Sequence, residues 1–301
     1  MIESASLSAT GPQLSSTSMW VRKIPLFLSV ATIVGVGFVT AAYAGDSASQ
    51  SATEDEQAQS EQVPPATAQT APAKPQLDPI TAVTFADNIG TTYIFARDVA
   101  KILNDPVEMT PDGKSLTIGE KKVEKFRRLY GGDALIPVRD IVQFDGTLYA
   151  DPITRELTVT LPQGEFIVTV GKKRIEVDKA TQELTAFQGD IVVMKTNIST
   201  GRPGHNTPNG EFETGPVKER MHYSRKYDNA PMPYSIQVNG DIFFHGYSSV
   251  PSYPASHGCI RIPLGRKNPA RYLYGWAETG IETKIFGSFS WETRRRKGRR
   301  G

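Results

Sequence analysis

The sequence holds a single cysteine, Cys259, among its 301 residues. One cysteine cannot form an internal disulfide, so the folded parts must be stabilised by burial of apolar side chains. The formal net charge is only +2, which gives no argument for a nucleic-acid partner. A zinc site built from Cys259, His245 and His257 would lack a second cysteine and the recurrent ligand spacings. The sequence therefore predicts no metal ion.

Charge is absent from residues 24–42, an uncharged stretch that follows two basic residues. Small residues at 42 and 44, before Gly45, fit a signal-peptidase cleavage site. We expect residues 1–44 to be a signal peptide or a signal anchor, since the stretch is nearly long enough to cross a bilayer. Either outcome exports the remainder to the periplasm or the cell wall. An unpaired thiol is a liability in such a compartment unless the protein uses it.

Large apolar residues are nearly absent from residues 45–78, which are rich in Ala, Gln, Ser, Thr, Pro and Glu. Such a segment cannot bury enough surface to offset its ordering entropy, so we expect a disordered linker. At the other end, residues 288–301 contain a run of arginine and lysine. We interpret this basic tail as a solvated segment.

Residues 79–162 contain an internal repeat. The run YIFARDV at Tyr93–Val99 aligns with LIPVRDI at Leu135–Ile141. Each copy leads to a turn and a short alternating strand, at Ser115–Ile118 and at Glu156–Val159. A repeated strand–helix–turn–strand unit indicates a small α+β module built by duplication.

This duplicated module resembles the copper amine oxidase N-terminal-like stalk domain of exported bacterial proteins. The resemblance implies a wall-binding or spacer role and, despite the name, no copper. The Arg-Asp pair in each copy is either a ligand contact or a structural ion pair at a helix start.

Residues 163–287 have a different pattern, which predicts a mainly β domain with long loops, a curved sandwich or barrel. We expect one helix, at Asn268–Trp276. The expected strands are Phe166–Val170, Asp190–Met194, Tyr234–Val238 and Asp241–Phe244.

Acyl transfer needs a nucleophile, a base, a group that orients the base, and donors for the oxyanion. Cys259, in the run SHGCIR, is the candidate nucleophile, and His245 is a candidate base that would lower the pKa of the thiol. The Gly246 carbonyl or a distant acid would orient the imidazole. The N–H groups of Gly258 and Cys259 are candidate oxyanion donors, and Arg261 could pair with a substrate carboxylate.

The His-Gly pair at 245–246, followed by SHGCIR, resembles the L,D-transpeptidase (YkuD) family of bacterial wall enzymes. Upstream, Ser199-Thr200-Gly201 and the run TPNGEF at Thr207–Phe212 resemble the STG…TPxGxF stretch of that family. The resemblance covers about 120 residues in order. It implies a YkuD-type β-sandwich or barrel.

The resemblance makes Cys259 the acylated thiol and His245 its base, oriented by the Gly246 carbonyl. Gly258 belongs to the catalytic loop, and Ser256, His257 and Arg261 are the expected substrate-binding residues. Lys218–Pro233 matches no part of the family pattern. His205 and His222 also match no family position, and we expect both to be surface-loop histidines.

The implied reaction is that of a peptidoglycan L,D-transpeptidase, which forms 3–3 cross-links through a cysteine acyl-enzyme on tetrapeptide stems and releases D-alanine. No cofactor is implied. The partners would be peptidoglycan stem peptides, wall polymer bound by the stalk, and a membrane if the anchor is retained. Two alternatives remain open from the sequence: an L,D-carboxypeptidase or lysine-attaching enzyme with the same acyl-enzyme, and a non-catalytic wall-binding protein.

Overall fold

The computed structural model describes residues 74–291. The predicted signal or anchor, most of the predicted linker and most of the basic tail lie outside the described residues. Within residues 74–291, no helix combines the length and the apolar character needed to cross a membrane. The protein is mainly β, as predicted.

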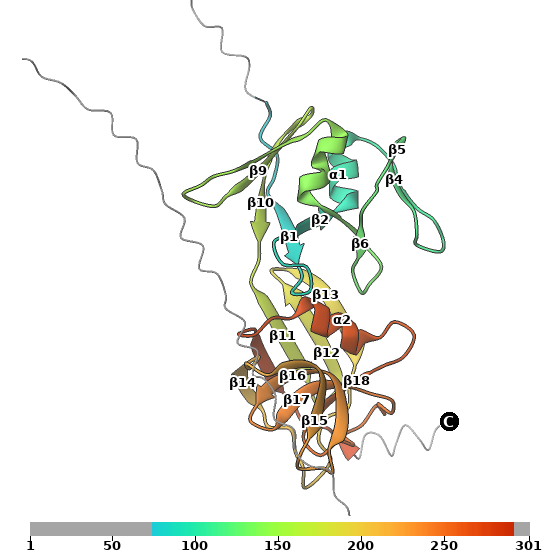
Figure 1. The fold of residues 1–301 in the computed structure, drawn as a ribbon, viewed down its shortest axis with the longest axis vertical. Coiled ribbons are helices and arrows are strands. Elements are labelled where there is room, and N and C mark those ends of the chain that lie inside the picture. Colours follow the sequence, from blue (N-terminus) through green and yellow to red (C-terminus); the bar gives the residue numbers. More distant parts are fainter. Residues whose placement is uncertain (1–73, 292–301) are drawn as a thin grey trace, which may run out of the picture. The chain divides into compact units, whose positions relative to one another are not determined.

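The N-terminal part is built on a seven-stranded sheet with strand order β6-β7-β2-β1-β10-β9-β8 (Figure 1). A second, small sheet has the order β3-β4-β5. The strands are β1 (Ile80–Thr84), β2 (Thr92–Phe95), β3 (Val107–Met109), β4 (Leu116–Ile118), β5 (Lys121–Lys122), β6 (Arg127–Arg128), β7 (Ala134–Pro137), β8 (Thr147–Ala150), β9 (Leu157–Leu161) and β10 (Gly164–Val170). The helices are α1 (Ala96–Leu103) and the 3₁₀ helix η1 (Val138–Phe144).

The two copies of the repeat fold alike and pair with each other. Their strands β2 and β7 run antiparallel, with Ile94 opposite Ile136. Each strand continues directly into a helix, and each helix ends at a left-handed residue, Asn104 (φ 60°) or Asp145 (φ 58°). Asn and Asp tolerate this conformation better than other residues with a side chain. The duplication is therefore present in three dimensions, whereas the resemblance to a stalk domain stays a prediction.

The two Arg-Asp pairs of the repeat are ion pairs at helix starts. Arg97 Nε lies 3.8 Å from Asp98 Oδ1, and Arg139 Nε lies 3.9 Å from Asp140 Oδ1. Both aspartates occupy the first turn of their helix, where a negative charge interacts favourably with the helix dipole. These contacts fit the structural interpretation of the pairs.

The boundary between the two parts lies later than residue 163. The sequence predicts that β10 belongs to the second domain, but β10 pairs parallel with β1 and antiparallel with β9. Its alternate residues Phe166 and Val168 belong to the N-terminal core. The first part also begins earlier than expected, because Leu77 N–H donates to the Glu165 carbonyl (2.7 Å).

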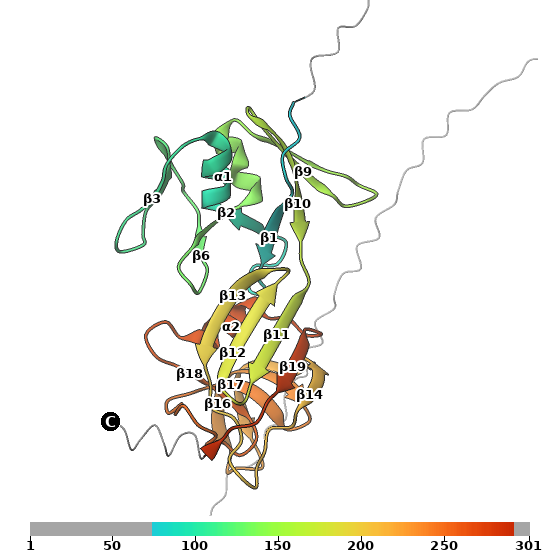
Figure 2. The ribbon, with the colours of Figure 1, turned by 180° about the vertical axis from the view of Figure 1, so that it is seen from behind.

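The second part is a sandwich of two sheets, with strand orders β13-β12-β11-β19-β14 and β15-β16-β17-β18 (Figure 2). The predicted helix is present as α2 (Pro269–Trp276). The strands are β11 (Lys173–Asp178), β12 (Glu183–Gln188), β13 (Ile191–Asn197), β14 (Gly210–Glu213), β15 (Lys218–Ser224), β16 (Ala230–Asn239), β17 (Ile242–Tyr247), β18 (Ile260–Pro263) and β19 (Glu282–Phe286).

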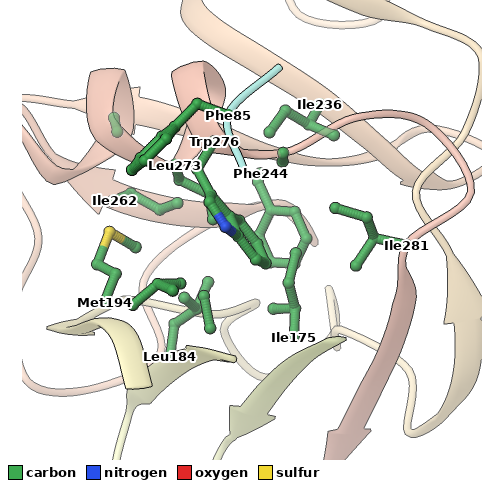
Figure 3. Close-up of a cluster of buried hydrophobic side chains, with 14 of the residues drawn as sticks. Phe85, Ile175, Leu184, Met194, Ile236, Phe244, Ile262, Leu273, Trp276 and Ile281 are labelled. Atoms are coloured by element: carbon green, nitrogen blue, oxygen red, sulfur yellow. The ribbon is translucent and has the colours of Figure 1, made fainter. Parts of the chain in front are cut away.

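The core of the sandwich surrounds Trp276, which is completely buried (Figure 3). Ile175 and Leu184 reach it from the five-stranded sheet, and Phe244 and Ile262 from the four-stranded sheet. Because successive side chains of a strand point to opposite faces, Phe244 and Ile262 fix which residues of β17 and β18 face away from this core. Those residues carry the candidate site.

Candidate active site

Two neighbouring strands carry the predicted site. β17 and β18 pair in parallel, with His245 opposite Arg261. Both side chains lie on the face that points away from the core, because their strand neighbours are buried in it. Cys259 comes immediately before β18, two residues ahead of Arg261, and therefore at one end of the same face. The positive charge of Arg261 acts on the pKa of both His245 and Cys259.

His245 is held in one tautomer. Its side chain is buried, with 5% of the residue exposed, and Nδ1 lies 3.0 Å from the Gly246 carbonyl oxygen. A carbonyl oxygen only accepts hydrogen bonds, so Nδ1 carries the proton and Nε2 keeps a free lone pair. This is the orientation expected for a general base.

Burial, together with a smaller effect of the nearby Arg261 charge, lowers the pKa of His245 to about 4. The hydrogen bond to Gly246 opposes this effect, since it favours the protonated ring. The imidazole is consequently neutral at pH 7 and available to accept a proton.

The pKa of the Cys259 thiol is raised rather than lowered. Burial is the largest cause, and the Asp241 charge adds to it, while the Phe243 N–H and Arg261 oppose it. The thiol donates to the Asp241 carbonyl oxygen (3.4 Å), a contact that only the protonated form can make. The expectation that His245 lowers the pKa of this thiol is therefore wrong for the free protein. The site holds a neutral thiol and a neutral imidazole.

These two pKa shifts predict the pH dependence of turnover. The base form of His245 is lost as the pH falls through about 4, so kcat/KM should fall on the acid side near pH 4. Because the pKa of Cys259 is raised, no thiolate-linked change should occur between pH 5 and about 8. Initial rates measured from pH 3.5 to 9 test this. An acid limb near pH 6.5 would show an imidazole that is not desolvated.

The loop before Cys259 is closed by its own serine. The Ser256 hydroxyl donates to the Cys259 carbonyl (2.5 Å) and accepts from the Gly258 N–H (3.1 Å). Ser256 is 1% exposed and both contacts of its hydroxyl lie inside the loop, so substrate binding by Ser256 stays a prediction. The Gly258 N–H is engaged inside the loop and does not serve as an oxyanion donor here. Of the two donors expected from the sequence, the Cys259 N–H is the one left.

Gly258 has φ 120°, a left-handed conformation that side chains rarely adopt. A Cβ at this position would also lie 3.0 Å from the Ile242 Cδ1. Both constraints explain why a glycine precedes Cys259.

The STG stretch, residues 199–201, forms backbone hydrogen bonds with the loop before Cys259 and with β18. The Thr200 carbonyl accepts from the N–H groups of Ala255 (2.9 Å) and Ser256 (3.0 Å). Ser199 exchanges both backbone hydrogen bonds with Arg261, at 3.0 and 2.9 Å. The stretch therefore positions the strand and the loop on both sides of Cys259.

The TPNG stretch, residues 207–210, also forms hydrogen bonds that hold the loop before Cys259. Thr207 Oγ1 donates to the Gly258 carbonyl (2.6 Å) and accepts from the Gly201 N–H (2.9 Å). A Cβ at Gly201 would lie only 1.8 Å from the His205 carbonyl oxygen, so no other residue fits there. The STG and TPNG stretches thus both hold the loop before Cys259 in its conformation.

Ser256→Ala should lower the rate of Cys259 acylation about 10-fold or more, because both hydrogen bonds that close the loop are lost. Single-turnover acylation measured by intact mass tests this. Thermal unfolding of the same variant should show only a modest loss of stability. An unchanged acylation rate would remove Ser256 from the positioning of the nucleophile.

Residues 172–285 match the model of the L,D-transpeptidase catalytic domain, YkuD. This YkuD segment begins next to β11, which agrees with the boundary given by the sheet pairing. Every site residue discussed above lies inside it. A comparison with curated proteins found no match.

Solved structures of L,D-transpeptidases are similar to the chain. The protein from Stackebrandtia nassauensis is 26% identical over 39% of this chain and 57% of its own, with a TM-score of 0.36. The protein from Xylanimonas cellulosilytica is 26% identical over 39% and 62%, with a TM-score of 0.35. The one from Mycobacterium smegmatis is 14% identical over 69% and 100%, with a TM-score of 0.36. The matched part of this chain thus spans about three fifths of the first two.

His257 lies at the surface of the YkuD segment and makes contacts on two sides. Its Nε2 accepts from Arg202 Nη2 (2.8 Å), and its ring lies edge-on to His205, 4.9 Å between centroids. The Tyr227 ring also lies 4.9 Å from the His257 ring, and the Tyr227 hydroxyl donates to the His257 carbonyl (3.4 Å). His205 therefore lies beside the candidate site, whereas the sequence predicts only a surface-loop histidine.

The segment without a family counterpart forms the hairpin of β15 and β16. His222 lies on β15 rather than on a surface loop. Its ring stacks on Phe243, with 4.8 Å between ring centroids, and its Nδ1 lies 2.8 Å from Glu219 Oε2.

Arg261 packs its guanidinium over the Tyr247 ring, 4.0 Å from the ring centroid.

Gln182 is a positioning residue that local sequence patterns do not reveal. Its buried side chain accepts from the Thr200 N–H (2.8 Å) and donates to Thr200 Oγ1 (2.9 Å). No local pattern marks Gln182, because its partner Thr200 lies 18 residues away in the sequence.

Within residues 74–291, no group of three or more His, Cys, Asp or Glu side chains could hold a metal ion.

Proposed function

We propose that the chain is a peptidoglycan L,D-transpeptidase that forms 3–3 cross-links on tetrapeptide stems. The observation that carries this proposal is the placement of Cys259 and His245 on one face of β17 and β18, with His245 Nδ1 held by the Gly246 carbonyl, inside the segment that matches the YkuD catalytic domain. A fixed base beside a lone thiol suits acyl transfer through a covalent intermediate.

In the acylation step, the thiol turns from the Asp241 carbonyl toward Nε2 of His245. The proton passes to Nε2 while sulfur attacks the carbonyl carbon of the third residue of the donor stem. The Cys259 N–H donates to the oxyanion that forms. Collapse of this intermediate breaks the bond to the terminal D-alanine, whose amine leaves with the proton from His245.

In the second step, an amine of an acceptor stem attacks the thioester. His245 takes the proton of the attacking amine and returns it to sulfur as the thiol leaves. A neutral imidazole suits this step, because a protonated ring could not accept the proton. The reaction consumes no nucleotide and needs no resident cofactor.

Arg261 is a candidate contact for the donor. Among the described residues, no ion pair within 4.0 Å includes Arg261, although its charge acts on both reacting groups. An unpaired guanidinium beside the nucleophile suits a carboxylate of the peptide. Substrate binding by Arg261 and His257 remains part of this proposal.

The test is mass spectrometry of the products formed by the full chain from purified tetrapeptide muropeptides. A cross-linked dimer that has lost one D-alanine supports the transpeptidase. Free tripeptide without any dimer would instead identify an L,D-carboxypeptidase. No product at all, together with retained binding to wall sacculi, would identify a wall-binding protein.

The proposed place of action is outside the cytoplasm, in the periplasm or the cell wall. The supporting observation is the uncharged stretch at residues 24–42 with its basic flank and cleavage-like site. The N-terminal module would then act as a spacer or wall-binding element ahead of the catalytic segment.

A further inference from the structure

A cluster of nitrogen-bearing side chains flanks the catalytic loop. It consists of Arg202, His205 and His257, and we call it the cationic flank. Arg202 Nη2 donates to His257 Nε2 (2.8 Å), so the His257 ring is neutral and carries its proton on Nδ1. The remaining N–H groups of Arg202 and the Nδ1–H of His257 are donors, and they belong to exposed residues.

The charges around this cluster have one sign. Besides partial burial, the groups that lower the pKa of His257 are Arg202, His205 and Arg261, all of them cationic or able to become so. Within residues 74–291, none of the ion pairs includes Arg202. Asp241, the acid that acts on Cys259, lies 4.0 Å from Lys226. The flank therefore holds donors and positive charge, and in the described part of the chain no carboxylate forms an ion pair with Arg202.

The backbone ties the cationic flank to the nucleophile. The Arg202 N–H donates to the Ser256 carbonyl (3.0 Å), and the His205 N–H donates to the Arg202 carbonyl (2.9 Å). The close approach of His205 to Gly201 fixes the turn between them. The Tyr227 ring packs against His257 from the β15–β16 hairpin. A group bound here would be held at a constant distance from Cys259.

We propose that Arg202, assisted by His205 and His257, binds a free carboxylate within the donor peptide. This carboxylate is distinct from the one that leaves with D-alanine. A planar guanidinium with unpaired N–H groups matches a carboxylate in geometry and charge. The subsite rests on the proposed function, because it places an acidic peptide with its scissile carbonyl at Cys259. It makes Arg202 a specificity-determining residue for the donor.

The experiment compares two synthetic tetrapeptide donors, one with its internal carboxylates free and one with the same groups as carboxamides. The full chain should prefer the carboxylate donor by about 10-fold in kcat/KM, the effect of one charge-assisted contact at a partly exposed site. Arg202→Gln should bring this ratio close to one. Arg202→Lys should keep part of the preference, because it keeps the charge and loses the planar fork.

Arg266→Gln is the matched control, since it removes an exposed arginine of the same segment beyond the other end of β18. It should keep the ratio of the unchanged protein. Alkylation of Cys259 at equal rates in both variants would show that the loop is intact. Equal use of the two donors by the unchanged protein would overturn the subsite alone. Failure to turn over either donor would overturn the proposed function instead.

Discussion

Cys259→Ala is expected to abolish formation of the cross-linked dimer, with a loss on the order of 10⁴-fold or more. The thiol is the group that would form the acyl-enzyme, and the sequence has no other cysteine to replace it. Neither Ser256 nor Thr207 can substitute, because both hydroxyls are buried and engaged in hydrogen bonds. The measurement is mass spectrometry of muropeptide products.

The same variant can be checked without a natural substrate. A carbapenem is a strained acyl donor and should add once to the unchanged protein, as seen by intact mass, and not to Cys259→Ala. Because Ala is close to Cys in size, thermal unfolding of the two proteins should be similar. Cross-linked product from the variant would eliminate Cys259 as the nucleophile, and with it the covalent mechanism.

His245→Ala should reduce turnover by about 10²–10³-fold, in line with the loss of a general base. The raised pKa of Cys259 makes the dependence strong, since an unassisted thiol in this site stays protonated at pH 7. The variant should regain rate as the pH rises above 9 and the thiolate forms directly. Rate profiles of the two proteins from pH 6 to 10 test this prediction.

His222→Ala is the matched control for this loss. It removes a half-buried imidazole of the same domain that is paired with Glu219 and stacked on Phe243, so it should change turnover far less. His245→Gln addresses the cavity left by a ring that is 95% buried, because it keeps more of the volume. Near-normal rates in both His245 variants would remove this residue from the role of base.

Several features could be read directly from the sequence because they depend on residues close together in the chain. The alternating strands and the helix at Asn268 follow from local periodicity and from an N-cap whose side chain accepts from the Arg271 N–H (2.9 Å). The repeat was visible because its two copies retain the same short run. The candidate nucleophile and the candidate base could be named because SHGCIR and the His-Gly pair resemble the pattern of a known family.

Other features were decided only by contacts between distant segments. β10 belongs to the first sheet because Val168 pairs with Ile80, a choice that its own alternating pattern leaves open. The pKa of the Cys259 thiol is raised because tertiary packing buries this residue, whereas the sequence indicates only the effect of the nearby imidazole.

The hydrogen bonds of the loop also depend on tertiary structure. The Ser256 hydroxyl and the Gly258 N–H point into the loop because the buried polar groups there must be paired. Arg202 and His205 lie at the site because the STG stretch pairs with a loop that is more than 50 residues away in the sequence. The sequence by itself determined which groups can do the chemistry, and burial and long-range hydrogen bonding determined their protonation and their neighbours.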